Sequence, residues 1–340
     1  MSTILLTGAN SFVGSHIIDA LIKLNHKVVG TVRSAAAANG IYSLHPEWKD
    51  SLEIVVVEDI TNGSAWDELF KKNKFDHVVH VAAPLLDNPD NTDYDQHFLN
   101  PSVEGNLAIL RSAQANAPTL KSVVVTGSIN ACTTGSPEEV SGGPLTNSTW
   151  LPISKEAARE AQNAYISYCS GKKEGELAIW DFVKTNSPQF SVTVFLPALI
   201  FGPPIEPVKQ GAKGLHYSAK IIYSFFNGSY TIIPPTTFPS YVDVRDLAEA
   251  HVKALTEPKV ANKRLTIGGQ SMTYTAIVHS LAKVPELEGR LPADSGEDEQ
   301  VVPATIIADE ATEALNLTFR SLDETMADTA KRILELEKLV

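Results

Sequence analysis

Short β-branched runs alternate with longer segments of helical period through the first 200 residues of the chain. The apolar runs predict strands near residues 3–7, 27–32, 52–57, 77–82, 121–126 and 191–196. After the first run, Ile18, Leu21 and Ile22 repeat at the spacing of one helix face, and Asn25 is a stop signal. Helical spacing also predicts helices over residues 102–113 and from 156 to about 184. The alternation predicts an α/β fold with a doubly wound parallel sheet flanked by helices.

The composition changes after Pro197, where prolines and glycines interrupt the chain at short intervals. Here we expect a helix over residues 243–255, a strand over 264–267, a helix near 276–283 and a terminal helix over 322–339. We therefore predict a first domain over residues 1–200 and a smaller α/β lobe over 201–340. The segment around residues 241–256 is expected to pack back on the first domain.

Charge and cysteine content narrow the possible partners. The chain of 340 residues has a formal net charge of −12, and none of its runs of Lys or Arg exceeds two residues. This disfavours binding to nucleic acid or to an anionic membrane. Its two cysteines, Cys132 and Cys169, lack metal-ligand spacing, which favours a reducing compartment and no metal. Without a recognisable targeting or membrane-spanning segment, we expect a cytoplasmic protein.

The first predicted strand leads directly into a glycine-containing turn over residues 8–14. Gly8 permits a tight turn, Gly14 lets the following helix approach the strand, and free backbone N–H groups at the helix start can hold a pyrophosphate. Ser11 stands where a middle glycine is expected, and its hydroxyl could donate to a phosphate. An ordinary strand-to-helix turn is the alternative, but the position at the first βα turn favours a dinucleotide-binding Rossmann domain.

The end of the second strand indicates which dinucleotide binds. NAD-binding proteins usually carry a carboxylate there, whereas NADP-binding proteins accommodate a phosphate. Here Arg33 follows the strand and the next carboxylate is Glu47. Because a guanidinium can pair with the 2′-phosphate, the sequence favours NADP(H), although Arg33 is alternatively a solvated surface residue.

Tyr168 and Lys172 are four residues apart in a predicted helix and therefore lie on one face. An adjacent ammonium favours phenolate, so we expect Lys172 to lower the pKa of Tyr168. Ser128, at the end of the fifth strand, could hydrogen-bond a substrate oxygen, although a strand-end cap is its alternative role. A Tyr–Lys pair at this spacing often arises by chance, and its place in the fold gives it weight.

Together with residues 58–60 (EDI), 79–84 (VHVAAP), 196–203 (LPALIFGP) and 241–251 (YVDVRDLAEAH), these motifs resemble the extended short-chain dehydrogenases/reductases. The similarity covers nearly the whole chain and is to the branch that contains dihydroflavonol reductases and fungal NADPH-dependent methylglyoxal/3-methylbutanal and other carbonyl reductases. It implies that cofactor-binding residues are Gly8, Asn10, Ser11, Phe12, Val13, Gly14, Arg33, Asp59, Ile60, Ala82, Ala83, Pro84, Thr126, Tyr168, Lys172, Pro197, Ala198, Leu199 and Ile200. Segment 241–251 is expected to be structural.

Three residues depart from the family pattern. Ser11 replaces the middle glycine, Gly127 replaces the serine that commonly precedes the catalytic one, and Gly171 lies inside the Tyr–Lys helix. Glycine costs a helix interior about 1 kcal/mol, so Gly171 either allows a close approach of cofactor or backbone, or reflects drift.

The resemblance implies reduction of an aldehyde or ketone. NADPH would supply its pro-S hydride from C4, Tyr168 the proton, and Ser128 would fix the carbonyl oxygen, while Lys172 binds the nicotinamide ribose. Small apolar carbonyl compounds are the expected substrates, bound in the smaller lobe's cleft by Leu85, Ser128, Asn130, Tyr168 and Phe201, with Tyr217 and Phe225 as further candidate walls.

Other functions stay open at this point. An NADP-dependent alcohol or hydroxysteroid dehydrogenase, or a dihydroflavonol-like reductase, would use the same residues. A non-catalytic NADP(H) sensor or scaffold would use only the fold. A sugar-nucleotide epimerase or dehydratase is disfavoured because residues 200–240 hold no Arg or Lys cluster that suggests a nucleotide diphosphate. The chain is expected to be a monomer or a homodimer.

Overall fold

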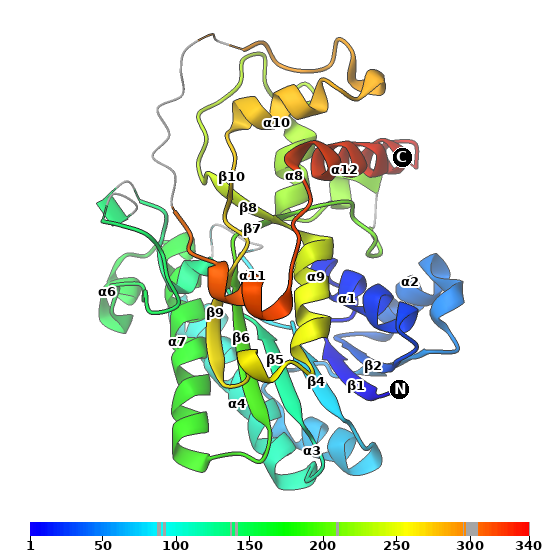
Figure 1. The fold of residues 1–340 in the computed structure, drawn as a ribbon, viewed down its shortest axis with the longest axis vertical. Helices are drawn as coiled ribbons and strands as arrows, with labels where there is room; N and C mark the ends of the chain where they lie inside the picture. Colours follow the sequence, from blue (N-terminus) through cyan, green and yellow to red (C-terminus); the bar gives the residue numbers. More distant parts are fainter. Residues whose placement is uncertain are drawn as a thin grey trace.

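A seven-stranded parallel sheet runs through the larger part of the molecule in the computed structural model, which describes residues 1–86, 90, 93–136, 138–139, 142–208, 211–294, 296 and 305–339 (Figure 1). Most of its strand residues are buried, as expected for a sheet covered on both faces. The order reverses between β1 and β4, the switch point of a doubly wound sheet. The predicted fold class is therefore confirmed. In spatial order, the strands are β3 (Leu52–Val56), β2 (Lys27–Val32), β1 (Thr3–Thr7), β4 (His77–His80), β5 (Ser122–Thr126), β6 (Ser191–Pro197) and β9 (Lys263–Ile267).

Two layers of helices cover the sheet, each with its own apolar core. One layer contains α1 (Phe12–Lys23), α2 (Ala35–Leu44), α9 (Val244–Ala254) and α11 (Asp309–Leu315). The other contains α3 (Gly63–Lys72), α4 (Asn100–Asn116) and α7 (Ala164–Asn186). A π-helical turn, η2 (Asp95–Leu99), leads into α4.

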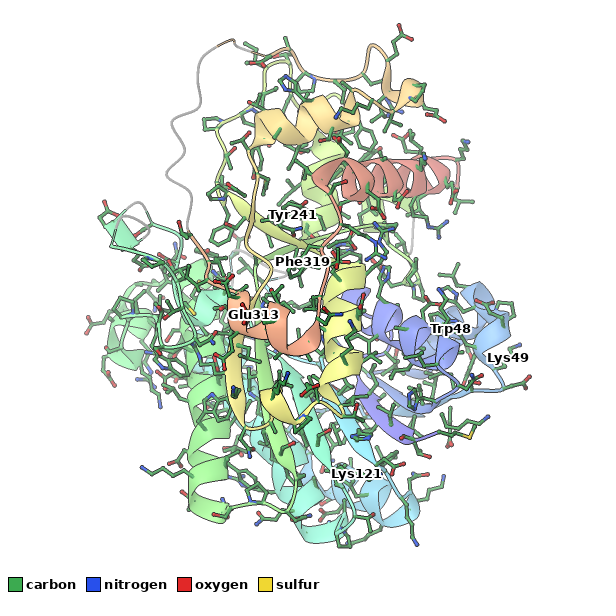
Figure 2. The ribbon with its side chains drawn as sticks, in the orientation of Figure 1. Trp48, Lys49, Lys121, Tyr241, Glu313 and Phe319 are labelled. Atoms are coloured by element: carbon green, nitrogen blue, oxygen red, sulfur yellow. The ribbon has the colours of Figure 1, made fainter. Side chains whose placement is uncertain are left out.

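A second lobe stands above the carboxyl edge of the large sheet (Figure 1). It contains a small sheet of β7 (Leu199–Phe201), β8 (Ser240–Asp243) and β10 (Gln270–Ser271), and the helices α8 (Tyr217–Ser224), α10 (Tyr274–Leu281) and α12 (Leu322–Glu337). These elements share a separate apolar core. Figure 2 shows Tyr241 and Phe319 between the lobes; Tyr241 belongs to the upper core and Phe319 packs against the lower one.

The structure corrects two predicted elements. The strand predicted over residues 264–267 is β9, which pairs with β6 at the edge of the large sheet and does not belong to the second lobe. The helix predicted from 156 to 184 is two helices, α6 (Lys155–Glu160) and α7. Gln162 separates them with a left-handed φ of 44°, and the Asn163 side chain then accepts from the Ile166 amide to cap α7.

The division near residue 200 stays a prediction. Across the described ranges, every helix is too short or too polar to span a membrane.

Candidate active site

The glycine turn after β1 has the geometry of a nucleotide-binding loop. Gly8 has a φ of +74°, and a Cβ atom on it would lie 3.2 Å from the Ala82 nitrogen. A Cβ atom on Gly14 would lie 2.3 Å from the Gly8 carbonyl oxygen. Both glycines are therefore required for the close packing of this loop, and α1 starts directly above β1 with its N-terminal amides at the sheet's carboxyl edge.

Ser11, which stands at the expected middle glycine, acts within the loop. Its hydroxyl donates to the Gly8 carbonyl at 2.7 Å and accepts from the Gly14 amide at 3.1 Å. Ser11 is therefore the N-cap of α1. The hydroxyl proton that could have reached a phosphate is already used by Gly8.

Residues at the next strand ends extend this edge toward β2 and β3. Arg33 is exposed directly after β2, and Ser34 then caps α2. Asp59 is exposed after β3, but its carboxylate already accepts from the amide and hydroxyl of Thr61, each at 2.8 Å. Ile60 packs closely on Gly105 of α4. Arg33 is thus exposed at the carboxyl end of β2, whereas Asp59 is held in its own turn.

Thr7 and His80 form a buried link that sequence reasoning missed. The Thr7 hydroxyl accepts from the amides of Val81 and Ala82, each at 3.0 Å, and lies 2.9 Å from His80 Nδ1. Because both oxygen lone pairs are used, the hydroxyl proton goes to Nδ1 and the imidazole proton is on Nε2. Burial lowers the pKa of His80 to about 4, so the ring is neutral. A threonine immediately before the glycine turn is the sequence signal that could have indicated this link.

Ser128, Tyr168 and Lys172 come together at the carboxyl edge beside β4 and β5. Ser128 follows β5 and is 8% exposed, and its hydroxyl accepts from the Asn130 amide at 3.1 Å. Tyr168 and Lys172 lie one turn apart on α7, with Lys172 Nζ 5.8 Å from the centre of the Tyr168 ring. The Ser128 hydroxyl donates to Asn130 Oδ1 at 3.3 Å, and it is near enough to the Tyr168 hydroxyl to favour the phenolate. Two hydroxyls and an ammonium therefore share one small region.

The pKa of Tyr168 differs from the expectation. Burial raises it to about 12, and the nearby Ser128 hydroxyl opposes this only in part. Burial also lowers the pKa of Lys172 to about 8. In the chain by itself, the pKa of Tyr168 is therefore raised and not lowered as expected, because removing the phenolate from water outweighs the effect of Ser128. At neutral pH, Tyr168 keeps its proton.

A cavity of about 30 Å³ is lined by Lys172 and by residues of α4, α7 and the ends of β4 and β5. Its lining includes the unpaired Nε2 atom of His80 and the unpaired Oε2 atom of Glu176, together with Asn106.

The departures at Gly127 and Gly171 have a packing cause. A Cβ atom on Gly127 would lie 2.8 Å from the Phe195 carbonyl oxygen on β6, so a serine does not fit there. At Gly171, a Cβ atom would lie 3.1 Å from the Phe98 Cβ and 3.2 Å from its carbonyl atoms. Gly171 therefore allows the backbone of η2 to pack closely on α7.

The predicted substrate-binding residues do not gather at one place as the catalytic residues do. Leu85 is 65% exposed beyond β4, and Asn130 donates to the Thr133 carbonyl and to the Tyr165 hydroxyl. Phe201 is 1% exposed and packs in the core of the second lobe, as does Phe225, whereas Tyr217 is on the surface. Burial therefore gives Phe201 a packing role, and we do not retain it as a substrate contact.

Other predicted cofactor residues continue along the edge. Thr126 ends β5, and its hydroxyl lies 2.8 Å from His251 Nε2 on α9. His251 Nδ1 donates to the Leu247 carbonyl, so Nε2 accepts from Thr126. Pro197 ends β6 and Ala198 is buried before β7, which begins with Leu199 and Ile200. His251 was expected to serve packing, and its contact with Thr126 ties α9 to the site.

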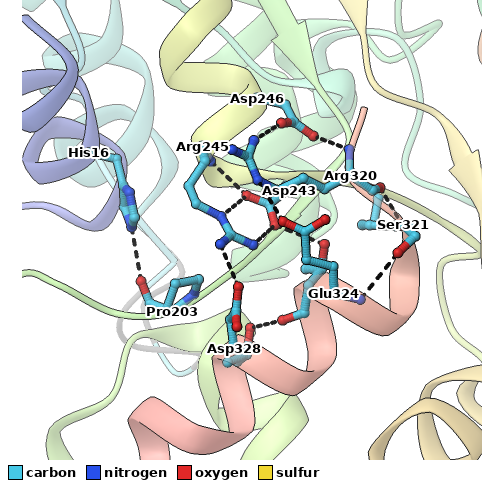
Figure 3. A network of polar contacts seen from close by, with 12 residues as sticks. His16, Pro203, Asp243, Arg245, Asp246, Arg320, Ser321, Glu324 and Asp328 are labelled. Carbon is cyan, nitrogen blue, oxygen red and sulfur yellow. Dashed lines mark hydrogen bonds and ion pairs between the residues drawn. The ribbon is translucent and has the colours of Figure 1, made fainter. Parts of the chain in front are cut away.

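An ionic network at the start of α9 joins the lobes (Figure 3). Asp243 caps α9 and accepts from the Arg245 guanidinium at 2.8 and 3.0 Å. Arg245 also donates to Asp328 of α12 at 2.6 Å, and Asp246 pairs with the backbone and side chain of Arg320. These groups are occupied by one another, in keeping with the structural role expected for segment 241–251.

This fold, with its glycine turn and its Ser–Tyr–Lys cluster, defines a dinucleotide-binding protein of the Rossmann class. A family model described as the NAD dependent epimerase/dehydratase family matches residues 4–268. The chain belongs to this family, which forms the extended short-chain dehydrogenases/reductases.

Named relatives match along nearly the full length. The chain is 31% identical over 347 residues to the NADPH-dependent methylglyoxal reductase of Saccharomyces cerevisiae, covering 98% of this chain and 99% of that protein. It is 32% identical over 342 residues to a ketoreductase of Aspergillus niger, covering 98% and 97%.

Solved structures give the same picture. The yeast methylglyoxal/isovaleraldehyde reductase complexed with NADPH superposes with a TM-score of 0.84 at 28% identity, covering 99% of this chain and all of that one (100%). A UDP-glucose 4-epimerase of Thermotoga maritima has a TM-score of 0.71 at 18% identity, which shows a common fold alone.

Proposed function

We propose that this protein is an NADPH-dependent carbonyl reductase that converts an aldehyde or ketone into the alcohol. The observation that carries the proposal is the meeting of Ser128, Tyr168 and Lys172 at the carboxyl edge of the sheet, beside the glycine loop. The relatives named as a methylglyoxal reductase and a ketoreductase support the same reaction class.

The residues present fit a dinucleotide. Gly8 and Gly14 allow the loop to pack closely on Ala82 and on itself, so that the first amides of α1 are available to a pyrophosphate at the carboxyl edge of the sheet. Arg33 would pair with the adenosine 2′-phosphate, and Pro197 to Ile200 would lie along the nicotinamide. When bound, NADPH supplies the hydride that reduces the carbonyl carbon.

The protein's own part is to orient the substrate and to move a proton. Because the pKa of Tyr168 is raised to about 12, its hydroxyl is protonated at neutral pH and can donate to the carbonyl oxygen. Ser128 would hold that oxygen, and Lys172 would stabilise the phenolate left by proton transfer. At neutral pH, Tyr168 is thus in the protonation state that carbonyl reduction requires.

The proposed substrate is a small, mostly apolar carbonyl compound. Asn130 donates its backbone amide to the Ser128 hydroxyl, and Leu85 presents an exposed apolar side chain after β4. A dehydrogenase working toward the ketone, and a non-catalytic NADP(H)-binding protein, are the rival functions that the test must separate.

Oxidation of NADPH with methylglyoxal, 3-methylbutanal and an aryl ketone tests the proposal. Tyr168→Phe should reduce turnover by about 100-fold or more without a change in NADPH affinity. Tyr223→Phe removes a hydroxyl beside Glu337, on α8, and is the matched control that should retain turnover. Equal activity of the Tyr168 variant would refute its role as proton donor, and binding of NADPH without reduction of any carbonyl would favour the non-catalytic function.

A further inference from the structure

The side chain of Asn130 connects the end of β5 to the start of α7. Its Nδ2 atom donates to the Thr133 carbonyl at 3.2 Å and to the Tyr165 hydroxyl at 3.0 Å. On its other side, Asn130 Oδ1 accepts from the Ser128 hydroxyl at 3.3 Å. Tyr165 lies one turn before Tyr168 on α7. One amide side chain therefore contacts both the proposed catalytic serine and the helix that carries the proposed catalytic tyrosine.

The orientation of this amide is fixed by its partners. The Tyr165 hydroxyl donates its proton to the Thr134 carbonyl at 2.7 Å, so towards Asn130 it can only accept. The Thr133 carbonyl is likewise only an acceptor. Both groups therefore require the NH₂ group of Asn130, and the amide oxygen faces Ser128. Because an amide oxygen has no proton, the hydrogen bond between Asn130 and Ser128 must use the serine proton.

The Ser128 hydroxyl is held at two points by the same residue. It also accepts from the Asn130 backbone amide at 3.1 Å, which makes Ser128 the N-cap of the turn η3 (Ile129–Ala131). The backbone amide fixes the serine oxygen and occupies one of its lone pairs. The contact with Oδ1, at 3.3 Å, is longer than the usual range of about 2.5–3.0 Å for O–H···O bonds. It therefore directs the serine proton without holding it strongly.

We infer that Asn130 is a positioning residue that holds the Ser128 hydroxyl ready to donate to the carbonyl oxygen of the substrate. The inference rests on the proposed carbonyl reduction. The oxygen that develops negative charge accepts a stronger hydrogen bond than the neutral Oδ1 atom, so the Ser128 hydroxyl turns from Asn130 to the substrate. The proton stays on Ser128 and only its acceptor changes. Tyr165 acts one step further away, because it orients the amide that orients the serine.

A double-mutant cycle on turnover tests whether Asn130 acts through Ser128. The assay uses NADPH and whichever of methylglyoxal, 3-methylbutanal and the aryl ketone is reduced fastest. Asn130→Ala should lower kcat by about 5- to 10-fold, the effect of one lost hydrogen bond, and leave the Kd of NADPH unchanged. Ser128→Ala should lower kcat by about 100-fold. The double variant should match Ser128→Ala within about a factor of two, whereas a merely structural role of Asn130 would multiply the two losses.

Tyr165→Phe is the second variant, because it keeps the ring and removes the acceptor that orients Asn130. Tyr165 is 38% exposed, so this change leaves the core of the protein intact. It should lower kcat by about 2- to 3-fold, and this loss should disappear in the Ser128→Ala background. Tyr223→Phe is again the matched control, and it should leave kcat unchanged in both backgrounds.

The outcomes separate this inference from the proposed function. If the unaltered protein reduces none of the three compounds, the proposed function fails and the inference fails with it. If it reduces one of them, an unchanged kcat in Asn130→Ala, or an equal loss in both backgrounds, overturns the inference alone. If Asn130→Ala does not fold, Tyr165→Phe decides in the same way. An unchanged kcat in that variant, or an equal loss with and without Ser128, would then overturn the inference.

Discussion

Two neighbouring regions of the molecule differ in how their charged groups are paired. These regions are the ionic network at the start of α9 and the catalytic cluster. In the ionic network at the start of α9, each buried carboxylate has a cation within hydrogen-bond distance (Figure 3). Asp243 is fully buried and bonded to Arg245 and Thr325, and Asp246 is 1% exposed and bonded to Arg320. Burial alone would raise the pKa of Asp243, but the bonds from Arg245 outweigh it and the pKa lies below its ordinary value.

At and beside the catalytic cluster, by contrast, two nitrogen atoms lack a hydrogen-bond partner. Among the described residues, Lys172 Nζ has no hydrogen-bond acceptor, and burial lowers its pKa to about 8. His80 Nε2 has no partner either, and the pKa of Tyr168 is raised. Unpaired buried groups cost stability and gather where a ligand supplies the missing partners. The comparison therefore distinguishes a region that stabilises the fold from one that is prepared for a ligand.

The largest effect is expected from breaking the paired region. Asp243→Ala removes one partner of a buried ion pair and the cap of α9, so Arg245 is left partly buried with only Asp328. We expect a loss of about 3–5 kcal/mol in the free energy of unfolding, measured by urea denaturation. NADPH affinity of the folded fraction should be retained.

Asp328→Ala is the matched control on the same arginine. The Asp328 side chain is 37% exposed, and Arg245 keeps its bonds to Asp243 in this variant. The loss should stay within about 1 kcal/mol, as for exposed ion pairs. If both variants lose the same stability, burial does not distinguish the two contacts and the comparison fails.

Acid should act on both regions through neutral histidines. Burial lowers the pKa of His80 and of His251 to about 4, below the unfolded value of about 6.5. Between these values the unfolded chain binds more protons, so stability is present above pH 6.5 and is lost as the pH falls toward 4. Each ring should contribute a slope of about 1.4 kcal/mol per pH unit at its steepest.

Variants assign the acid slope. His251→Gln should reduce the slope of unfolding free energy against pH by the contribution of one imidazole, and His279→Gln should leave this slope unchanged. The His279 side chain is 62% exposed, so folding removes little of it from water. An unchanged slope in His251→Gln would show that this ring is protonated in the folded protein.

Removing the unpaired charge should stabilise the protein and destroy its activity. Lys172→Met takes away a partly buried ammonium that has no acceptor in the described part of the chain, so we expect about 1–3 kcal/mol of added stability at pH 7. The folded-state pKa of about 8 lies below the ordinary 10.5, so the unaltered protein itself gains stability as the pH rises through this window. The advantage of the variant should therefore shrink near pH 10. Turnover should fall by about 100-fold or more; a destabilised variant would mean that Lys172 is already paired.

The sequence indicated the large sheet well, because its strands are buried on both faces and stand out as β-branched runs. It placed β9 in the wrong lobe, since the chain leaves the large sheet after β6 and returns only at Lys263, and no local pattern marks that return. The interruption between α6 and α7 depends on one left-handed residue, Gln162, in a segment of otherwise helical spacing.

The sequence predicted the site residues that stand in a local motif. It did not predict contacts between residues that are distant in the chain. Gly8 and Tyr168 stand in recognisable local patterns. Phe12 and His216 stack although they are about 200 positions apart, and hydrophobic periodicity cannot predict such a contact. The direction of the Tyr168 pKa also could not be read from spacing, because burial decides it.

Substitution of Ser11 should have the smallest effect on cofactor affinity. Ser11 lies in the glycine loop, but its hydroxyl is already hydrogen-bonded within the protein. Its hydroxyl serves Gly8 and Gly14, so little of it is left for a phosphate. Ser11→Gly restores the glycine of the family pattern and should cost a few tenths of a kcal/mol in unfolding free energy, against about 1 kcal/mol for Ser11→Ala. The Kd of NADPH, measured by fluorescence titration, should stay within a factor of about two in Ser11→Gly, a difference of under about 0.5 kcal/mol. A tenfold weaker binding of NADPH in Ser11→Gly would show that the serine hydroxyl bonds the phosphate, and Ser11 would then be a ligand of the cofactor.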